Sequence, residues 1–386
     1  MILRALKNKL IETAGYYPVI LLDGPRQAGK STLLKDTFPN KTYVSLESID
    51  NRMFAIKDPH GFLSEYKKGA IIDEVQNAPN LISYLQEEVD KNPESGRFIL
   101  SVSQNLAISG LISQSLAGRV GILHLLPLSG PELYQSDHDI TSLYRLLWTG
   151  GYPRIYYKKI PASQWLADYV ATYLQRDVKQ LLNISDINRF TTFIKLCAAN
   201  SSQLLNLSKL GADTGISHNT ANSWLSVLEA SFICFRLPAW HRNTKKQIVK
   251  TPKLHFFDSG LVCHLLGIQT PEQLRFHPLR GAIFETWVAS EYYKQQTNDG
   301  MPANLFHYRE ARGLEIDLIV NRGENLTLIE SKSGETLHSE HFKNINKLAD
   351  KITNDRPELK LNKILMFGGD KSSNRHGAKA ISWRDI

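Results

Sequence analysis

The segment VILLDGPRQAGKSTLLK, residues 19–35, decides the fold of the first part of the chain. A short apolar run at 19–22 is followed by a glycine-rich turn and then by residues that favour a helix. Gly24 and Gly29 let backbone N–H groups approach an anion with no Cβ in the way, and the start of the helix adds the positive end of its dipole. The spacing therefore predicts a phosphate-binding loop between a strand and a helix.

This spacing, Gly-x-x-x-x-Gly-Lys-Ser, is the Walker A pattern, and it predicts ATP as ligand with Mg²⁺ as cofactor. Lys30 is expected to reach the β- and γ-phosphates, and the Ser31 hydroxyl is expected to bind Mg²⁺. The residues expected to contact the nucleotide are Gly24, Pro25, Arg26, Gln27, Ala28, Gly29, Lys30, Ser31 and Thr32.

A second motif supplies two carboxylates. The segment KKGAIIDEVQNAP, residues 67–79, follows a strand candidate at 42–46 and ends its apolar run with Asp73 and Glu74. An acidic pair at the end of a strand is common by itself. Here one predicted strand separates the pair from the Walker A segment, and this order is typical of a Walker B motif. Asp73 would hold Mg²⁺ through water, and Glu74 would orient and polarise the attacking water. The pair therefore predicts ATP hydrolysis.

Two further features leave alternatives open. The strand candidate RFILSVSQN, residues 97–105, ends in polar residues that either sense the γ-phosphate or cap the next helix. These residues are Ser101, Ser103, Gln104 and Asn105. Arg119 precedes a final strand at 120–126, and it either compensates transition-state charge, in cis or from a neighbouring subunit, or forms a structural salt bridge.

Length and composition predict a soluble, cytoplasmic protein. With 386 residues the chain exceeds what one core usually organises, so two or three domains are expected. No apolar run approaches the ~18 residues of a membrane-spanning helix, and frequent charges near the start argue against a secretory signal. Three widely spaced cysteines favour packed, reduced thiols over a zinc site or a disulfide framework. We also expect Ile2, Leu3, Leu6, Leu10 and Ile11 to pack an amphipathic first helix on the first domain.

The net charge of +8 suggests an anionic partner, and the excess lies beyond the first domain. Residues 1–130 hold fourteen basic and thirteen acidic groups, whereas residues 236–253 hold six basic groups and no acid. This segment follows two predicted helices, 207–214 and 218–230, which are joined by a turn and have Ser217 as N-cap. That order is typical of a helix-turn-helix.

β-rich segments at 232–240 and 253–257 bracket HRNTKKQIVKTP, which predicts a winged helix. The predicted wing carries Arg242, Lys245, Lys246 and Lys250. Asn219, Thr220 and Asn222 on the second helix would face a DNA groove while the wing sits on phosphates. The alternative interpretation is a protein–protein spacer with solvated lysines.

The segment GLEIDLIVNRGENLTLIESKSG, residues 313–334, alternates apolar and polar residues on both sides of a turn and predicts a β-hairpin. Glu330 and Lys332 point to one face of their strand and Ser331 to the other. With the turn near Gly323, Asp317 falls close to Glu330 on the opposite strand.

Four segments, GPRQAGKSTLL, IIDEVQNAP, FILSVSQN and SLAGRV, resemble in order and spacing a large prokaryotic family of AAA+ ATPases with a C-terminal region of uncharacterised function. GGYPR at 150–154, YLQRDV at 173–178 and KLHFFDSGLVCHLLG at 253–267 resemble the family's second region. The resemblance implies a parallel sheet in which the sensor strand separates the Walker B strand from the P-loop strand. Ser-Val-Ser-Gln stands where the family usually has Thr-Gly-Ser-Gln, which puts the sensor corner in doubt.

A helical glutamate, a strand aspartate and Glu-x-Lys also resemble the PD-(D/E)XK nuclease core. This resemblance implies that Glu285, Asp317 and Glu330 bind Mg²⁺ or Mn²⁺, that Lys332 positions a water, and that Glu315 is a weaker extra ligand. Whether such a site cuts DNA or serves only as a binding module stays open.

Together these features predict an α/β protein of three units: an ATPase domain at 1–135, a helical and winged-helix domain at 136–275, and a nuclease-like domain at 276–386. The favoured function is an ATPase that moves a DNA-associated module. The alternatives are a signalling or scaffold ATPase with protein partners, and a metal-dependent nuclease gated by nucleotide.

Overall fold

A computed structural model describes residues 2–103, 115–134, 140–174, 186–240, 249–311 and 313–386. Its N-terminal unit is built on a five-stranded parallel sheet of order β2-β3-β4-β1-β5. The strands are β1 (Val19–Asp23), β2 (Thr42–Ser45), β3 (Ala70–Asp73), β4 (Phe98–Val102) and β5 (Val120–His124). β4 lies between β3 and β1, as the family resemblance implied.

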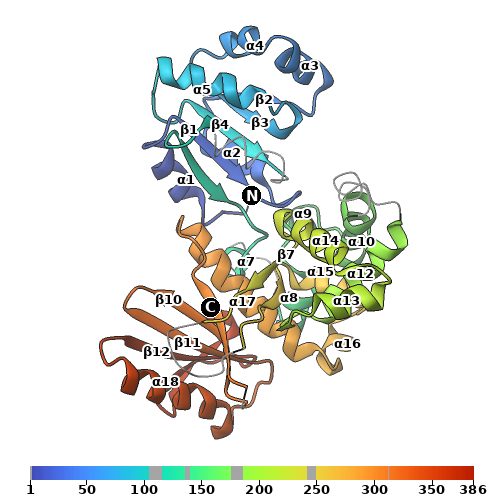
Figure 1. The fold of residues 1–386 in the computed structure, drawn as a ribbon, viewed down its shortest axis with the longest axis vertical. Coiled ribbons are helices and arrows are strands. Elements are labelled where there is room, and N and C mark those ends of the chain that lie inside the picture. Colours follow the sequence, from blue (N-terminus) through green and yellow to red (C-terminus); the bar gives the residue numbers. More distant parts are fainter. Residues whose placement is uncertain (1, 104–114, 135–139, 175–185, 241–248, 312) are drawn as a thin grey trace.

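Helices cover this sheet at the upper end of the molecule (Figure 1). They are α1 (Lys7–Ala14), α2 (Lys30–Thr37), α3 (Ile49–Lys57), α4 (Pro59–Glu65) and α5 (Leu81–Lys91). In the first helix, Leu6 and Leu10 are fully buried as expected, but Leu3 is 63% and Ile11 49% exposed. The prediction that these residues pack on the first domain was therefore wrong for these two, because Leu3 lies before the start of α1 and Ile11 lies on the exposed face of α1.

The middle of the chain is helical around a three-stranded sheet of order β6-β8-β7. Its helices are α7 (Gly130–Tyr134), α8 (Leu143–Thr149), α9 (Pro153–Tyr157), α10 (Ala162–Tyr169), α12 (Ile187–Ala199), α13 (Leu207–Thr214), α14 (His218–Ala230), α15 (Ser259–Leu265) and α16 (Pro271–Phe276). Its strands are β6 (Gln203–Leu204), β7 (Cys234–Leu237) and β8 (Lys253–Phe256). Ser217 accepts a hydrogen bond from the backbone N–H of Thr220, so the predicted N-cap of α14 is confirmed.

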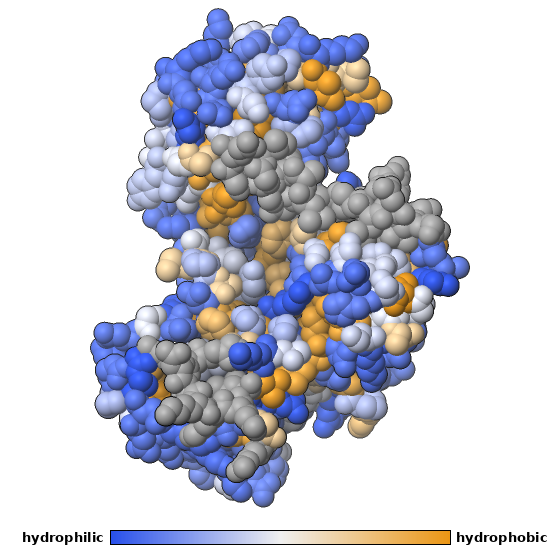
Figure 2. All heavy atoms as spheres, viewed as in Figure 1, coloured by the Kyte–Doolittle hydropathy of each residue, from blue (hydrophilic) through white to orange (hydrophobic). Residues whose placement is uncertain are grey.

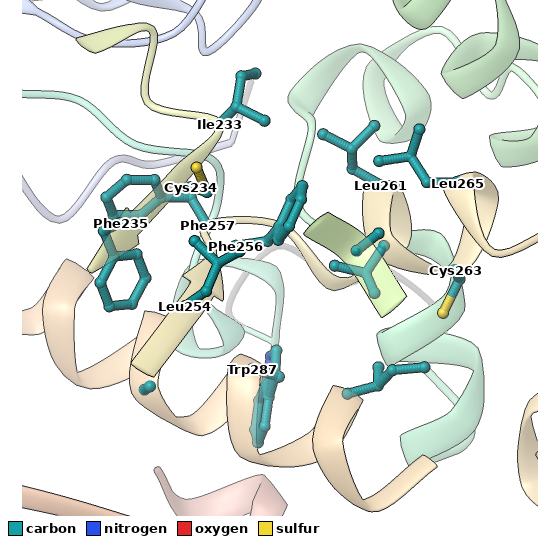
Figure 3. Close-up of a cluster of buried hydrophobic side chains, with 14 of the residues drawn as sticks. Ile233, Cys234, Phe235, Leu254, Phe256, Phe257, Leu261, Cys263, Leu265 and Trp287 are labelled. Carbon is teal, nitrogen blue, oxygen red and sulfur yellow. The ribbon is translucent and has the colours of Figure 1, made fainter. Parts of the chain in front are cut away.

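Figure 3 shows the apolar cluster behind this sheet, where β7 and β8 face α15 and α17 (Arg280–Asn298). Cys234 and Cys263 lie in it, and Cys197 is buried on α12. All three thiols are free, which confirms the prediction of packed, reduced cysteines. Burial raises the pKa of each thiol above its ordinary value, so none is poised to react as a thiolate.

The C-terminal unit is a six-stranded mixed sheet of order β13-β14-β12-β11-β10-β9, packed on α17 and α18 (Lys343–Asp355). Its strands are β9 (Leu305–Arg309), β10 (Glu315–Arg322), β11 (Asn325–Lys332), β12 (Lys360–Phe367), β13 (Ser373–Arg375) and β14 (Ala378–Ser382). β10 and β11 form the predicted hairpin, with Leu318 opposite Ile329. β12 then adds parallel to β11.

One buried apolar cluster runs through the middle and C-terminal units, from Leu126 to Trp383, while the N-terminal sheet keeps clusters of its own on its two faces. The long helix α17 contacts both β5 and β11. Figure 2 shows apolar residues gathered in the hollow between the upper unit and the lower part. No helix in the described part of the chain is both long and apolar enough to span a membrane.

Candidate nucleotide site and a second acidic cluster

The glycine-rich loop lies at the carboxyl end of β1 and has the backbone that the sequence predicted. Gly24 has φ +153°, and a Cβ there would lie 2.1 Å from the carbonyl oxygen of Leu125. Gly29 has φ +93° and precedes the first residue of α2. Side chains would clash or strain the chain at these positions, so the glycines allow the loop to pass this close to its neighbours.

The buried Lys30 amine donates hydrogen bonds of 2.9 Å to the carbonyl oxygens of Gly24 and Pro25. Both acceptors are neutral, so the loop wraps the lysine without cancelling its charge. Burial lowers the Lys30 pKa, although the negative charges of Glu74, Asp23 and Asp73 act to raise it. A cation held in this way can meet a ligand phosphate as its counter-ion.

Asp73 is the last residue of β3, and its carboxylate accepts hydrogen bonds from three hydroxyl groups. Its Oδ2 accepts from the Ser31 hydroxyl at 2.9 Å and from the Tyr43 hydroxyl at 2.5 Å, and its Oδ1 accepts from Ser101. Burial and the hydrogen bond to Asp73 raise the Tyr43 pKa. The structure thus joins the predicted Walker A serine and Walker B aspartate directly. The Tyr43 contact was not predicted, because nothing in the sequence of β2 sets that residue apart.

Glu74 follows Asp73 in a left-handed conformation, with φ 58° and ψ 49°. Its carboxylate accepts hydrogen bonds from Ser103 and Gln76, and its backbone N–H donates to the Ser101 hydroxyl at 3.1 Å. A positive φ is uncommon outside glycine and marks a position that its surroundings hold in place. The chain therefore turns sharply here and directs the carboxylate towards the end of β4.

A cavity of about 530 Å³ lies at this end of the sheet. The loop lysine, Asp73, Glu74 and Ser103 line one side of it. The N-terminal residues Ile2, Leu3 and Arg4 and the α9 residues Pro153, Arg154, Tyr157 and Lys158 line other parts. A triphosphate with its base fits a cavity of this size and mixed lining. The sequence did not predict the lining residues outside the two motifs, because their position beside the cavity depends on tertiary packing. Of the segments that contain them, only GGYPR was singled out in the sequence, as part of the family resemblance.

Arg4 connects the N-terminal segment to the phosphate loop through hydrogen bonds. Its guanidinium donates to the carbonyl oxygens of Ala28 and Leu126, both at 2.6 Å, and to Glu132 at 3.0 Å. Arg4 lowers the pKa of the buried Glu132, against the opposing effect of burial. A largely buried arginine that bonds through all three of its nitrogens in this way fixes the relative position of three segments of the chain.

Asp23, directly before the loop, is fully buried. One carboxylate oxygen accepts from the Gly24 N–H at 2.7 Å, and the other has no hydrogen-bond partner among the described residues and lies 3.9 Å from His124 Nδ1. Burial raises the Asp23 pKa to about 7 and lowers the His124 pKa. The pair therefore favours its neutral form beside the phosphate loop.

Arg119 does not line this cavity. It precedes β5, whose first residue pairs with Val19 at the amino end of β1, the sheet edge opposite to the loop. Its guanidinium instead binds Asp90, at 2.5 and 3.0 Å. An in-cis catalytic role for Arg119 is therefore not supported, and the structural salt bridge is what the structure contains. Among the sensor candidates, Ser101 and Ser103 reach the acidic pair, while Gln104 and Asn105 lie outside the described residues.

A second acidic cluster, defined as Glu285, Glu315, Asp317 and Glu330, lies where α17 meets the hairpin. The structure brings the predicted nuclease-like residues together: Asp317 accepts from the Ser331 N–H at 2.8 Å, and Lys332 Nζ lies 3.6 Å from Glu330. Burial raises the pKa of Glu285 to about 7 and also raises the pKa of Glu330, in each case reinforced by Asp317.

A further lysine, unforeseen from the sequence, enters this acidic cluster. Lys253 Nζ lies 2.8 Å from both Glu285 and Glu315 and 3.9 Å from Asp317. Across the part of the chain that the structure describes, no group of three or more His, Cys, Asp or Glu side chains is arranged to hold a metal ion. The predicted Mg²⁺ or Mn²⁺ site at Glu285, Asp317 and Glu330 is therefore not supported, because an ammonium already stands among the carboxylates.

The predicted DNA-contact residues can be placed only in part. Asn219 and Asn222 are exposed on α14, Thr220 is half-buried, and Lys250 is exposed. The other wing residues, Arg242, Lys245 and Lys246, lie outside the described residues.

Comparison with known proteins gives three consecutive domain matches. Residues 16–134 match an AAA domain, and residues 140–272 and 280–386 match two domains of unknown function (DUF8612 and DUF4143). The chain is 30% identical over 311 residues to "Uncharacterized protein Mb2031c" of Mycobacterium bovis and to "Uncharacterized protein Rv2008c" of Mycobacterium tuberculosis, covering 78% of this chain and 67% of each relative. The chain belongs to the family of these two proteins.

Two solved structures are also similar to parts of the chain. "The walker-type atpase paby2304 of pyrococcus abyssi" is 15% identical with a TM-score of 0.46, and it aligns over 69% of this chain and 96% of its own. AMPPCP-bound DnaA from Aquifex aeolicus is also 15% identical, with a TM-score of 0.30, over 58% of this chain and 85% of its own. The AAA match, the parallel sheet and the loop geometry together identify the N-terminal unit as an ATP-binding P-loop ATPase domain of the AAA type.

Proposed function

We propose that this protein hydrolyses ATP with Mg²⁺ as cofactor, using Lys30, Ser31, Asp73 and Glu74. The observation that carries the proposal is the hydrogen bond of 2.9 Å between Ser31 Oγ and Asp73 Oδ2, inside a cavity that Lys30 and Glu74 also line. This arrangement is what a Walker-type phosphate site requires.

The residues present fit a magnesium ion. The Ser31 hydroxyl would supply an oxygen ligand, which Mg²⁺ prefers, and the Asp73 carboxylate beside it would hold the ion through water. When bound, Mg²⁺ neutralises the charge that develops on the phosphate oxygens. The hydroxyls of Tyr43 and Ser101 hold the carboxylate of Asp73 in its orientation.

The chain's own residues carry the remaining roles. Lys30 binds the β- and γ-phosphates, exchanging its hydrogen bonds with neutral carbonyls for charge-assisted ones. Glu74 orients the attacking water and accepts a hydrogen bond from it. Ser103 and Gln76 hold the Glu74 carboxylate in place, so Ser103 is the sensor candidate that the geometry favours.

The test is phosphate release from ATP by wild type and by Glu74→Gln. Removing the charge that polarises the water should lower turnover about 100- to 1000-fold while ATP still binds. Glu87→Gln, on the exposed face of α5, is the matched control and should turn over ATP like wild type. Equal rates in Glu74→Gln and wild type would refute the role of Glu74.

We further propose three functional units, at 1–135, 136–275 and 276–386, with the middle one a DNA-associated winged helix. The support is the order of elements, in which α12, β6, α13, α14, β7 and β8 follow one another and the three strands form one antiparallel sheet. Exposed Asn219 and Asn222 on α14 lie where such a helix would meet a groove. The basic residues of the predicted wing, Arg242, Lys245, Lys246 and Lys250, would contact phosphates.

This second proposal is tested with the wing lysines. Lys246→Ala with Lys250→Ala should weaken DNA binding in a low-salt mobility-shift assay and reduce any stimulation of ATP turnover by DNA. The exposed pair Lys343→Ala with Lys347→Ala, on α18, is the control of equal charge. Equal binding by wild type and the wing variant would favour the alternative of a signalling ATPase with protein partners.

A gated nuclease remains the third alternative. Its support is the order α17, β9, β10, β11, α18 and β12, which is that of the nuclease-like core. The position of Lys253 argues against it as the resting state, because a metal ion would have to displace this amine.

A further inference from the structure

The position of Lys253 is unusual for a surface cation. It is the first residue of β8, and its side chain is only 2% exposed. The amine reaches out of the middle unit to Glu285 on α17 and to Glu315 and Asp317 on β10 of the C-terminal sheet. Three elements, separated by up to 64 positions in sequence, therefore meet at one ammonium group.

The carboxylates around this amine are themselves largely buried. Side-chain exposure is 16% for Glu285, 29% for Glu315 and 12% for Asp317, and it is 5% for Glu330, which belongs to the same acidic cluster. Buried carboxylates of this kind need a cation nearby, because desolvated like charges repel strongly. Lys332 on the hairpin supplies a second cation, but it is more exposed, at 37%, and among the described residues its ion pair is with Glu330 at 3.6 Å. Lys253 is the more central and better shielded cation.

We propose that the Lys253 ammonium takes the place of a divalent cation in the acidic cluster. The ammonium forms ion pairs of 2.8 Å with Glu285 and Glu315 and lies 3.9 Å from Asp317, so its positive charge stands among the carboxylates that a metal ion would need. The ammonium then offsets part of the negative charge of the cluster from within the chain and closes the cluster to Mg²⁺ and Mn²⁺. Removing the amine frees the side chains of Glu285, Asp317 and Glu330 to rearrange around a metal ion. This inference is independent of the ATPase proposal.

The test is Mn²⁺ binding, measured by electron paramagnetic resonance without nucleotide in an Asp73→Asn background that silences the phosphate-loop carboxylate. With Lys253 present, Asp317→Asn should not change Mn²⁺ binding. Lys253→Met should gain a site at least about 10-fold tighter than any in the background, since oxygen clusters of this kind are Mn²⁺ ligands. Adding Asp317→Asn to Lys253→Met should remove the gained site.

Two comparisons keep the test decisive. Lys332→Met, which removes the neighbouring amine, should gain no comparable site. If Lys253→Met does not fold, Lys253→Met with Glu315→Gln removes one carboxylate together with the amine and leaves the other three ligands in place. Mn²⁺ binding that Asp317→Asn abolishes while Lys253 is present would overturn the proposal, as would a folded Lys253 variant that gains no site.

Discussion

The two acidic centres of this protein differ in what faces their carboxylates. At the phosphate loop, Asp73 and Glu74 accept hydrogen bonds from hydroxyl and amide groups, and Lys30 donates to neutral carbonyl oxygens beside a cavity of about 530 Å³. In the acidic cluster, Lys253 is inserted among the carboxylates themselves. An acidic motif therefore predicts a cation site only where the chain has not already supplied the cation.

The largest effect should come from the lysine of the open centre. Lys30→Met removes the charge that meets the phosphates, so ATP turnover should fall by at least about 1000-fold. The folded state should lose little stability, because among the described residues no carboxylate is hydrogen-bonded to the buried Lys30 amine. Phosphate release and urea unfolding measure the two effects. Unchanged ATP turnover in Lys30→Met would contradict the role of Lys30 at the phosphate loop.

The lysine of the closed centre should show the opposite pattern. Lys253→Met leaves buried carboxylates without their cation and should lower the free energy of unfolding by about 3–5 kcal/mol. The folded fraction should still turn over ATP. Lys332→Met removes a more exposed amine, at 3.6 Å from Glu330, and is the matched control with a smaller effect. Equal stability of Lys253→Met and wild type would show that the cluster does not depend on this amine.

The buried Asp23 beside the phosphate loop should give the first centre a distinct pH dependence. Its pKa of about 7 exceeds the ordinary value of 3.8, so between these values the folded chain keeps a proton that the unfolded chain has lost. Raising the pH across this window therefore disfavours folding. Relative to Asp23→Asn, wild type should lose about 2 kcal/mol between pH 5 and pH 7. Parallel stability curves for the two proteins in urea unfolding would contradict the assignment.

The smallest effect is expected at Arg119, which lies at the sheet edge away from the loop. Arg119→Ala breaks an exposed ion pair with Asp90, so its free energy of unfolding should stay close to that of wild type. Turnover at low protein concentration should match wild type. A loss of turnover that appears only at concentrations where chains associate, and that Asp90→Ala does not reproduce, would assign Arg119 to a neighbouring subunit.

The sequence predicted the first centre well because its chemistry is local. The loop, its helix and the acidic pair occupy short segments whose spacing sets their geometry, and the parallel sheet brings Ser31 to Asp73 as expected. The elements of the middle unit were also predicted closely, since the N-cap Ser217 and the left-handed Gly215 mark helix ends locally.

What the sequence did not predict depends on contacts between distant segments. Tyr43, Arg4 and Arg154 reach the nucleotide cavity or its carboxylates only through the packing of separate elements. Lys253 was counted among the basic residues of a suspected DNA-binding segment, yet its side chain turns inward to carboxylates. The sequence of β8 alone does not determine where the Lys253 side chain lies, because the carboxylates that pair with it are on α17 and β10.

Binding of ATP with Mg²⁺ in the cavity at the phosphate loop is measured by isothermal titration calorimetry of the wild-type chain with Mg·ATP, with Lys30→Met as the paired titration. We expect saturable heat with one nucleotide bound per wild-type chain and at least about 100-fold weaker binding by Lys30→Met. No heat from wild type, or equal affinity in the two proteins, would contradict this expectation.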